Sequence, residues 1–190
     1  MPDPHAGLKP QTALGHDVPV TITIGAVTIT ERFDVALASL AVRRGRDKDL
    51  AKAAKAADLP LPPAAMAQSA VPYSAFWMTP EMWMVEAPFA SHEDITAGLK
   101  TALGDTASLT EQTDAWVRLD ITADNPVPLF ERLSNIDLAT KPVGFAARTV
   151  IEHLGTYLIK RSPTDITLYG PRASAQSLLH ALKVTAKSLL

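Results

Sequence analysis

The side chains that could do chemistry are scattered along this chain and do not form a known catalytic motif. The five histidines stand at positions 5, 16, 92, 153 and 180, and no two of them have the H-x-H, H-x-x-x-H or H-E-x-x-H spacing that places two imidazoles on one metal ion. The chain has no cysteine, which excludes disulfides, thiolate ligands and a cysteine nucleophile. We therefore expect no metal site.

Motifs for nucleotides and for activated serines are also missing from the sequence. Its nine glycines form neither G-x-G-x-x-G nor a P-loop, the two patterns that let backbone amides cradle phosphates. The nucleophile elbow G-x-S-x-G does not occur either. We expect no catalytic residue and no cofactor-binding residue in this chain.

Two arginine-containing segments are weaker candidates for anion binding, since guanidinium groups bind phosphate and carboxylate with two parallel hydrogen bonds. The first is residues 43–46, Arg-Arg-Gly-Arg, and the second is Arg172 after a Gly-Pro pair. The favoured alternative for 43–46 is a solvated turn between a strand and a helix, balanced by Asp47 and Asp49. For Arg172 the alternative is a place in the first turn of a helix.

Single histidines and acidic residues are also explained more simply by structural roles than by catalysis or metal binding. His153 ends a predicted strand, and we expect a partly buried imidazole bonded to the backbone. His92 and His180 are expected on the surface, in a first helical turn and near a helix end. Four acids could serve in acid–base pairs, but we interpret them as solvated residues of turns and strand edges: Asp120, Asp124, Glu152 and Asp165.

Composition excludes several partners. The chain has 190 residues, of which 47% are hydrophobic and only 20% are charged, below the roughly 25% of ordinary soluble domains. A net charge of −2 gives no field that would attract nucleic acid or an anionic membrane. No apolar run reaches the roughly 18 residues of a membrane span, and residues 1–5 do not resemble a secretory signal. We expect a cytoplasmic protein.

The first third of the chain predicts a hairpin, a strand and a helix. Apolar residues alternate with threonine over 18–31 around Gly25-Ala26, which predicts a two-residue hairpin turn that pairs Ile24 with Val27 and Ile22 with Ile29. A strand is expected over 37–43. The remaining expectations are a helix over 48–57 with Asp47 as N-cap, and a surface connection over the Pro-rich residues 58–72.

The rest of the chain continues the alternation of strands and helices. Ser91 is expected to cap a helix with Ile95, Leu99 and Leu103 on its apolar side and Gly104 at its end. Further strands are expected over 76–78, 82–85, 115–121, 146–153, 157–161 and 166–169, with a break at Gly155. One further helix is expected to begin at Asn125-Pro126 and another to cover 171–182, and residues 134–144 are expected to form a loop.

The order strand–helix–strand–strand–helix occurs twice in this series. An offset of 83 places residues 85–88 over residues 168–171. We therefore predict an α+β fold of two βαββα-type halves, about 35–105 and 106–190, with a mostly antiparallel sheet. Residues 1–34 would form an N-terminal segment that carries the hairpin.

An aromatic and methionine-rich stretch, residues 76–84, is the most unusual local feature. In the strand that follows its turn, Trp83 and Val85 alternate with Met82 and Met84, so both faces are apolar. A strand of this kind is either sandwiched inside its own fold or covered by another subunit. Burial inside the chain is slightly favoured, and a subunit contact remains open.

Together these segments resemble the gamma subunit of heterotetrameric sarcosine oxidase. The resemblance covers roughly residues 35–183. Four segments carry it: 40–45 before the Ala-rich helix; 76–85, similar to a "W-x-x-P-x-x-W-L" hairpin; 107–116, similar to "V-D-Q-S-H-A-W"; and 147–174, similar to "R-T-x-L-x-H" and "Y-x-P-R-S". Residues 133–138 depart from an expected "G-C-P-L-D-L", and the hairpin at 18–31 has no counterpart.

The resemblance implies a fold like the folate-binding T-protein of the glycine cleavage system. It also implies a non-catalytic role in assembling a four-subunit complex that demethylates sarcosine to glycine. The partners would be the alpha, beta and delta subunits, with FAD, FMN, NAD and tetrahydrofolate in the alpha and beta chains and zinc in delta. Two alternatives stay open. One is a free-standing folate-binding or aminomethyltransferase-like protein, and the other is the equivalent subunit of an N-methylglutamate dehydrogenase complex.

Overall fold

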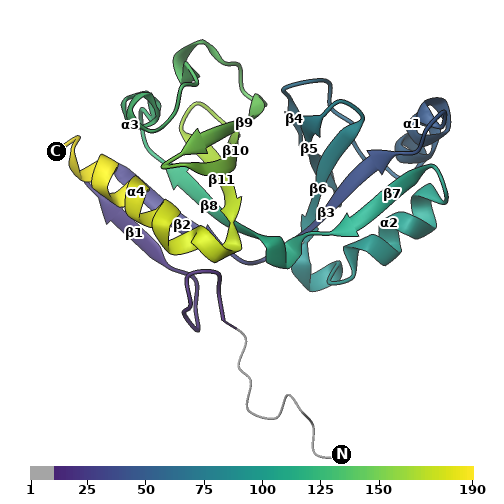
Figure 1. The fold of residues 1–190 in the computed structure, drawn as a ribbon, viewed down its shortest axis with the longest axis horizontal. Coiled ribbons are helices and arrows are strands. Elements are labelled where there is room, and N and C mark those ends of the chain that lie inside the picture. Colours follow the sequence, from purple (N-terminus) through teal and green to yellow (C-terminus); the bar gives the residue numbers. More distant parts are fainter. Residues whose placement is uncertain (1–10) are drawn as a thin grey trace, which may run out of the picture.

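Two antiparallel sheets form the frame of the molecule (Figure 1). The computed structural model describes residues 11–190. One sheet has six strands in the order β1-β2-β8-β11-β10-β9, and their bounds are Thr21–Ile24, Val27–Arg32, Trp116–Thr122, Asp165–Pro171, Leu154–Lys160 and Ala146–Ile151. The other has five strands in the order β4-β5-β6-β3-β7, with bounds Ala67–Gln68, Ser74–Thr79, Met82–Pro88, Val35–Val42 and Ala107–Glu111.

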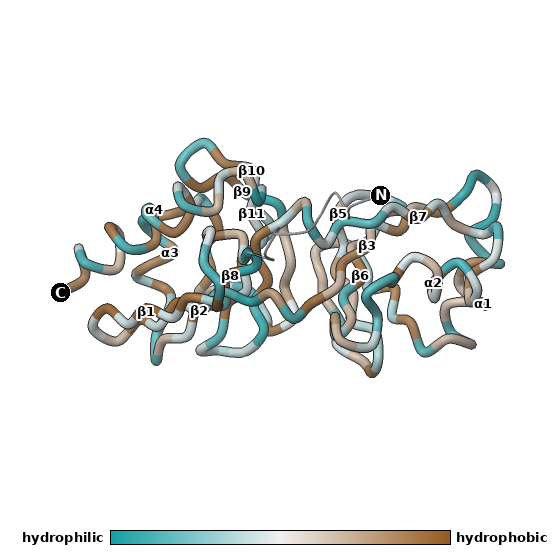
Figure 2. The backbone as a smooth tube through the Cα atoms, turned by 90° about the horizontal axis from the view of Figure 1, so that it is seen from below, coloured by the Kyte–Doolittle hydropathy of each residue, from teal (hydrophilic) through white to brown (hydrophobic). Residues whose placement is uncertain are grey.

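Helices cover the outer face of each sheet, so the layers run helix–sheet–sheet–helix. Figure 1 shows α3 and α4 outside the six-stranded sheet and α1 and α2 outside the five-stranded one. Seen from below, the two halves lie side by side, with α4 at one end and α1 at the other (Figure 2). The helices are α1 (Asp47–Ala56), α2 (Ile95–Leu103), α3 (Val127–Leu133) and α4 (Ala175–Lys187). None of the helices within residues 11–190 is long and apolar enough to cross a bilayer.

Three apolar clusters correspond to these layers. One lies between α3, α4 and the six-stranded sheet, and contains Phe130 and Leu182. The second lies between α1, α2 and the five-stranded sheet. The third consists of strand residues from both sheets, including Phe76 and Tyr169, and joins the two halves. The α+β class with two similar halves of antiparallel sheet is confirmed, and β7, which the expected bounds place in the second half, pairs with β3 in the sheet of the first.

The two sheets share one strand arrangement. The run β5-β6-β3-β7 in one matches β10-β11-β8-β2 in the other. In the five-stranded sheet the fourth strand of this run is β7, which follows α2 in the chain. In the six-stranded sheet the equivalent strand is β2, which precedes β3 in the chain. The N-terminal hairpin is thus built into the sheet of the C-terminal half, where β2 pairs with β8.

Local sequence signals set the hairpin and the helix end at Gly104. Ile24 pairs with Val27 and Ile22 with Ile29, as predicted. Gly25 has a φ of +55° in the turn, a conformation that glycine adopts without a steric penalty. Gly104, at φ +59°, ends α2.

Both predicted side-chain caps were wrong. Asp47 is the first residue of α1, and the N-cap position belongs to Arg46, whose side chain makes no capping bond. Ser91 lies in a 3₁₀ turn, Phe89–Ser91, and α2 begins later, with Asp94 accepting a hydrogen bond from the Ala97 amide at 3.0 Å. Pro88, the last residue of β6, directly precedes this extra turn.

Other differences arise where tertiary contacts outweigh local signals. The chain turns between β9 and β10 at Glu152 and His153, both at positive φ, while the predicted break at Gly155 lies inside β10. The Pro-rich connection is partly buried, with Leu59 only 4% exposed, and it includes β4. Strand β7 was missed, although Ala107 and Leu109 alternate with Ser108 and Thr110; it is a five-residue strand at the sheet edge that, among the described strands, pairs with β3 alone.

The strand that follows the turn of the aromatic stretch is buried on both faces by this chain at Met84 and Val85, whereas Met82 and Trp83 are only partly buried. Met84 of β6 faces the other sheet, and Val85 faces the helices α1 and α2. The Trp83 indole donates a hydrogen bond to the Pro62 carbonyl at 2.8 Å. Of the two explanations for a two-faced apolar strand, the fold therefore favours burial inside the chain.

Replacing Asp94 by alanine is expected to destabilise the protein by about 1 kcal/mol, because α2 loses its N-terminal side-chain acceptor. Urea unfolding followed by tryptophan fluorescence measures the change. Asp47→Ala is the matched control, since the Asp47 side chain makes no capping bond, and its loss should be smaller. Equal losses in the two variants would contradict the assignment of Asp94 as the cap.

Candidate functional site

A buried ionic cluster lies between the two sheets. Glu86 on β6 is the acceptor at its centre, with a side chain only 5% exposed. Arg161 Nη2 lies 2.6 Å from Glu86 Oε1, Arg118 Nη1 lies 3.4 Å from it, and the Tyr169 hydroxyl donates to the same oxygen. One carboxylate of the N-terminal half thus binds three donors of the C-terminal half.

A second carboxylate extends the cluster along the six-stranded sheet. Asp120 accepts two hydrogen bonds from Arg118, at 2.9 and 3.0 Å, in the paired geometry that guanidinium and carboxylate prefer. The Thr167 hydroxyl adds a third bond at 2.7 Å. Within residues 11–190 no buried side-chain nitrogen or oxygen lacks a partner. Arg118 is therefore held between two acids.

The cluster fixes the protonation state of its members. Burial by itself would raise the pKa of Glu86, but Arg161 and Arg118 together with the Tyr169 hydrogen bond hold it below its usual value. Burial and the Glu86 charge raise the pKa of Tyr169. At neutral pH Glu86 is an anion and Tyr169 a neutral donor, so neither is prepared to exchange protons with a substrate.

The unfolding free energy should depend on pH through Glu86. Because its folded pKa lies below the ordinary value of 4.5, its ionisation contributes stability above that pH, and the contribution is lost as the pH falls through the folded pKa. We expect the stability gap between wild type and Glu86→Gln to be constant from about pH 5.5 to 8 and to shrink below about pH 4.5. Urea unfolding at each pH measures the gap, and a gap that widened on acidification would contradict this prediction.

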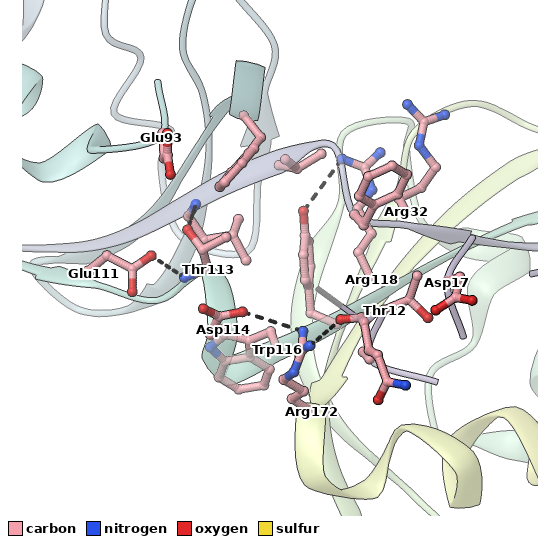
Figure 3. A pocket seen from close by; sticks show the side chains of 17 residues that line it. Thr12, Asp17, Arg32, Glu93, Glu111, Thr113, Asp114, Trp116, Arg118 and Arg172 are labelled. Carbon is pink, nitrogen blue, oxygen red and sulfur yellow. Dashed lines mark hydrogen bonds and ion pairs between the residues drawn. The ribbon is translucent and has the colours of Figure 1, made fainter. Parts of the chain in front are cut away.

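An open cavity of about 450 Å³ lies beside this cluster, where the two halves meet. The β2–β3 connection, the 3₁₀ turn Thr113–Ala115, β8 and residues 11–17 form its walls (Figure 3). Phe33, Phe89 and Trp116 give it aromatic surface, and Phe33 is 61% exposed. The volume suits a small ligand.

Each of the three arginines in the described part of the cavity wall is paired with a carboxylate, as Arg118 is in the ionic cluster. Figure 3 shows Arg172 beside Asp114, and the two are 3.5 Å apart. Arg172 also donates to the Gln11 carbonyl at 2.9 Å, while Arg32 binds Asp34 at 2.6 Å. No histidine, lysine or serine is among the described residues that line the cavity. The described walls can hold a molecule, and no nucleophile with an adjacent base is seen among them.

The sequence candidates for anion binding separate in the structure. Arg46 pairs with Asp49 at 2.8 Å and with Asp105 at 3.1 Å in the turn before α1. Residues 43–46 therefore form the balanced turn that was the favoured alternative, although Asp105 takes the place expected for Asp47. Arg172 lies in a 3₁₀ turn just before α4.

The described histidines also lie apart from one another and form no common site. His153 is exposed at the β9–β10 turn with a φ of +68°, so the expected partly buried imidazole was wrong. His92 follows a 3₁₀ turn and packs edge-on against Tyr73, with ring centroids 5.3 Å apart. His180 is exposed on α4. Among residues 11–190 no three His, Asp or Glu side chains lie close enough together to hold a metal ion.

Two of the four candidate acids differ from the expectation of solvated positions. Asp120 belongs to the ionic cluster, and Asp165 accepts bonds from Thr122 at 2.8 Å and Thr164 at 2.9 Å. A hydrogen bond from the Ser162 hydroxyl, followed by those from Thr122 and Thr164, lowers the pKa of Asp165. Asp124 and Glu152 are exposed, as expected.

Glu86 itself was missed as a site residue, although the sequence held a signal for it. The offset of 83 aligns Glu86 with Tyr169, and these two residues are hydrogen-bonded to each other. Both lie on the inward face of corresponding strands, β6 and β11. Where two similar halves pack face to face, residues near the centre meet their own counterparts, as in a two-fold interface.

Comparison with solved structures extends this description. One match is a chain of the heterotetrameric sarcosine oxidase from Corynebacterium sp. U-96, in complex with pyrrole 2-carboxylate, with a TM-score of 0.76 and 17% identity over 88% of this chain and 87% of that chain. The two chains share one fold. The resemblance seen in the sequence is thus confirmed in three dimensions along nearly the whole length of both chains.

A second match confirms the relation to the T-protein fold. It is the glycine cleavage system aminomethyltransferase T from Bartonella henselae, with a TM-score of 0.59 and 10% identity. The match covers 80% of this chain but 44% of that chain, so this protein spans less than half of the length of that enzyme. No protein-family model and no curated protein matches the sequence.

Proposed function

We propose that this chain is a non-catalytic subunit, equivalent to gamma, of a cytoplasmic complex of the sarcosine oxidase type. The observation that supports it most is the fold shared with a chain of heterotetrameric sarcosine oxidase over 88% of this protein. The ionic cluster agrees with this role, because its ionisable groups are occupied with one another and serve to join the two halves.

In this proposal the chemistry belongs to other subunits. Partners equivalent to alpha, beta and delta would supply the FAD, FMN, NAD and tetrahydrofolate sites, and this chain would contribute a rigid surface for assembly. Its residues would then need neither a nucleophile nor a proton shuttle, in keeping with the described lining of the central cavity.

Co-expression with alpha, beta and delta chains of a sarcosine oxidase from the same genome tests the proposal. We expect the four chains to co-elute from a sizing column in equal amounts and to oxidise sarcosine, while this chain alone oxidises none. Supplying N-methylglutamate in parallel distinguishes the related dehydrogenase complex. Activity of this chain alone, or complete assembly of the other three without it, would contradict the proposal.

A folate-binding protein is the second candidate, and the central cavity is the observation that favours it. Folate binding by the T-protein fold would need a cleft between the halves and an acidic side chain. The cavity at the junction offers both, with Glu93 and Glu111 in its wall. A thermal-shift assay of the isolated chain with 5-formyltetrahydrofolate tests this candidate, since a ligand that binds only the folded state raises Tm.

A further inference from the structure

A separate cavity of about 610 Å³ lies at the free edge of the six-stranded sheet. It is formed where α3 ends beside β9, two elements that Figure 1 places next to each other. Arg132, Ser134 and Asn135 line it from the end of α3 and the following loop, and Arg148 and Thr149 line it from β9. No acidic residue is among the described residues in its wall.

The two arginines of this edge cavity differ from most others in the chain. Arg46, Arg118, Arg161 and Arg172 each contact a carboxylate, whereas within residues 11–190 no ion pair is recorded for Arg132 or Arg148. Arg132 uses Nη1 to donate to its own helix, at the Pro128 carbonyl, 2.8 Å away. The rest of its guanidinium remains available for a ligand.

A glycine on the neighbouring strand gives Arg148 its position. Gly155 of β10 lies under the Arg148 side chain, and a Cβ placed there would come within 3.3 Å of Nη2 and 3.7 Å of Nε. A larger residue at 155 would therefore push the guanidinium away. The absence of a side chain at this point lets the Arg148 side chain reach across from β9 to β10, on the sheet face that also carries Tyr157.

Neutral donors complete the cavity. The Ser134 oxygen accepts a bond from the Ile136 amide, which leaves the hydroxyl proton free to donate. Thr149 donates to the Asn135 carbonyl oxygen at 3.3 Å, which leaves the Asn135 amide protons free. Because Ile151 pairs with Leu154 across a two-residue turn, the Val150 amide points away from β10, toward the free edge of β9.

We infer that this edge cavity binds an oxyanion, a carboxylate or phosphate group, with Arg132 and Arg148 as the cationic residues of its wall. Two guanidinium groups without a competing acid suit an anion that accepts paired hydrogen bonds, and the hydroxyl and amide donors add directional contacts. The anion could belong to a free small molecule or to an acidic side chain of an extended segment placed along β9. The inference does not depend on the proposed assembly role.

Titration of the full-length, ¹⁵N-labelled chain tests the site. The probes are inorganic phosphate and the capped peptide acetyl-Glu-Val-Glu-amide, at pH 7 and at an ionic strength held constant with sodium chloride. We expect saturable amide shifts confined to 132–135 and 148–150, and at least about tenfold weaker binding in Arg148→Gln. Arg44→Gln, at an exposed arginine of the other half, should leave binding unchanged.

The two probes separate the sources of the anion. Saturation by phosphate alone indicates a free ligand, and saturation by the peptide with added protection of the β9 amides indicates a partner segment. Three results would overturn the site: shifts that stay linear with both probes, shifts of equal size at residues 43–46, or unchanged affinity in Arg148→Gln.

Discussion

Glu86→Gln should lower the unfolding free energy by about 3–5 kcal/mol. The substitution removes the negative charge that Arg161 and Arg118 share but leaves both guanidinium groups between the sheets, where their side chains are only 20% and 19% exposed. Arg118 keeps Asp120 as a partner, but Arg161 loses the one carboxylate it contacts within residues 11–190, and a largely buried charge without an ionic partner is costly. With typical stabilities of about 5–15 kcal/mol, a loss of this size is easily measured.

Guanidinium-chloride unfolding followed by tryptophan fluorescence gives the free energy. Glu131→Gln, on the exposed side of α3, is the matched control and should change it by less than about 0.5 kcal/mol. A double-mutant cycle with Tyr169→Phe should show a coupling of about 0.5–3 kcal/mol, since the two residues are bonded to each other. Additive losses would mean that the hydrogen bond contributes nothing to the joining of the halves.

Much of the fold could be predicted because successive side chains of a strand point to opposite faces of the sheet. In the hairpin, alternation of apolar residues with threonine fixes which face is buried, and the Gly25-Ala26 turn fixes the register of Ile24 against Val27. The apolar stripe of Ile95, Leu99 and Leu103 likewise identified α2, and all three are buried. Periodicity of this kind depends only on the geometry of the backbone.

The parts that could not be predicted depend on contacts between distant segments. Glu86 and Asp120 look like ordinary solvated acids in the sequence, and only the packing of one sheet on the other brings Arg161 and Arg118 to them. The Glu152–His153 turn is a similar case, because its positive φ values are imposed by the pairing of β9 with β10 and not by turn-forming residues. Local propensity carries no information about either feature.

The similarity between the two halves of the sequence predicts some of these distant contacts. It also indicates which surfaces are free for a partner subunit. The offset that aligns Glu86 with Tyr169 predicts which strands correspond, and corresponding strands at the centre of the molecule face each other. The same packing uses the inner faces of both sheets for the chain's own core. A partner subunit must therefore contact helices, sheet edges or loops, and the edge of β9 is one such surface.

Phe76→Ala should cost about 3–5 kcal/mol, the range for a large aromatic removed from a packed core. Phe76 is fully buried, and its ring lies 5.5 Å from Tyr169 and 5.4 Å from Tyr157, both in the other sheet. Its neighbour Trp77 is the matched control, because the larger indole is only half-buried. The same denaturant unfolding measures both variants. A loss in Trp77→Ala equal to or larger than that in Phe76→Ala would show that packing between the sheets is not what joins the two halves.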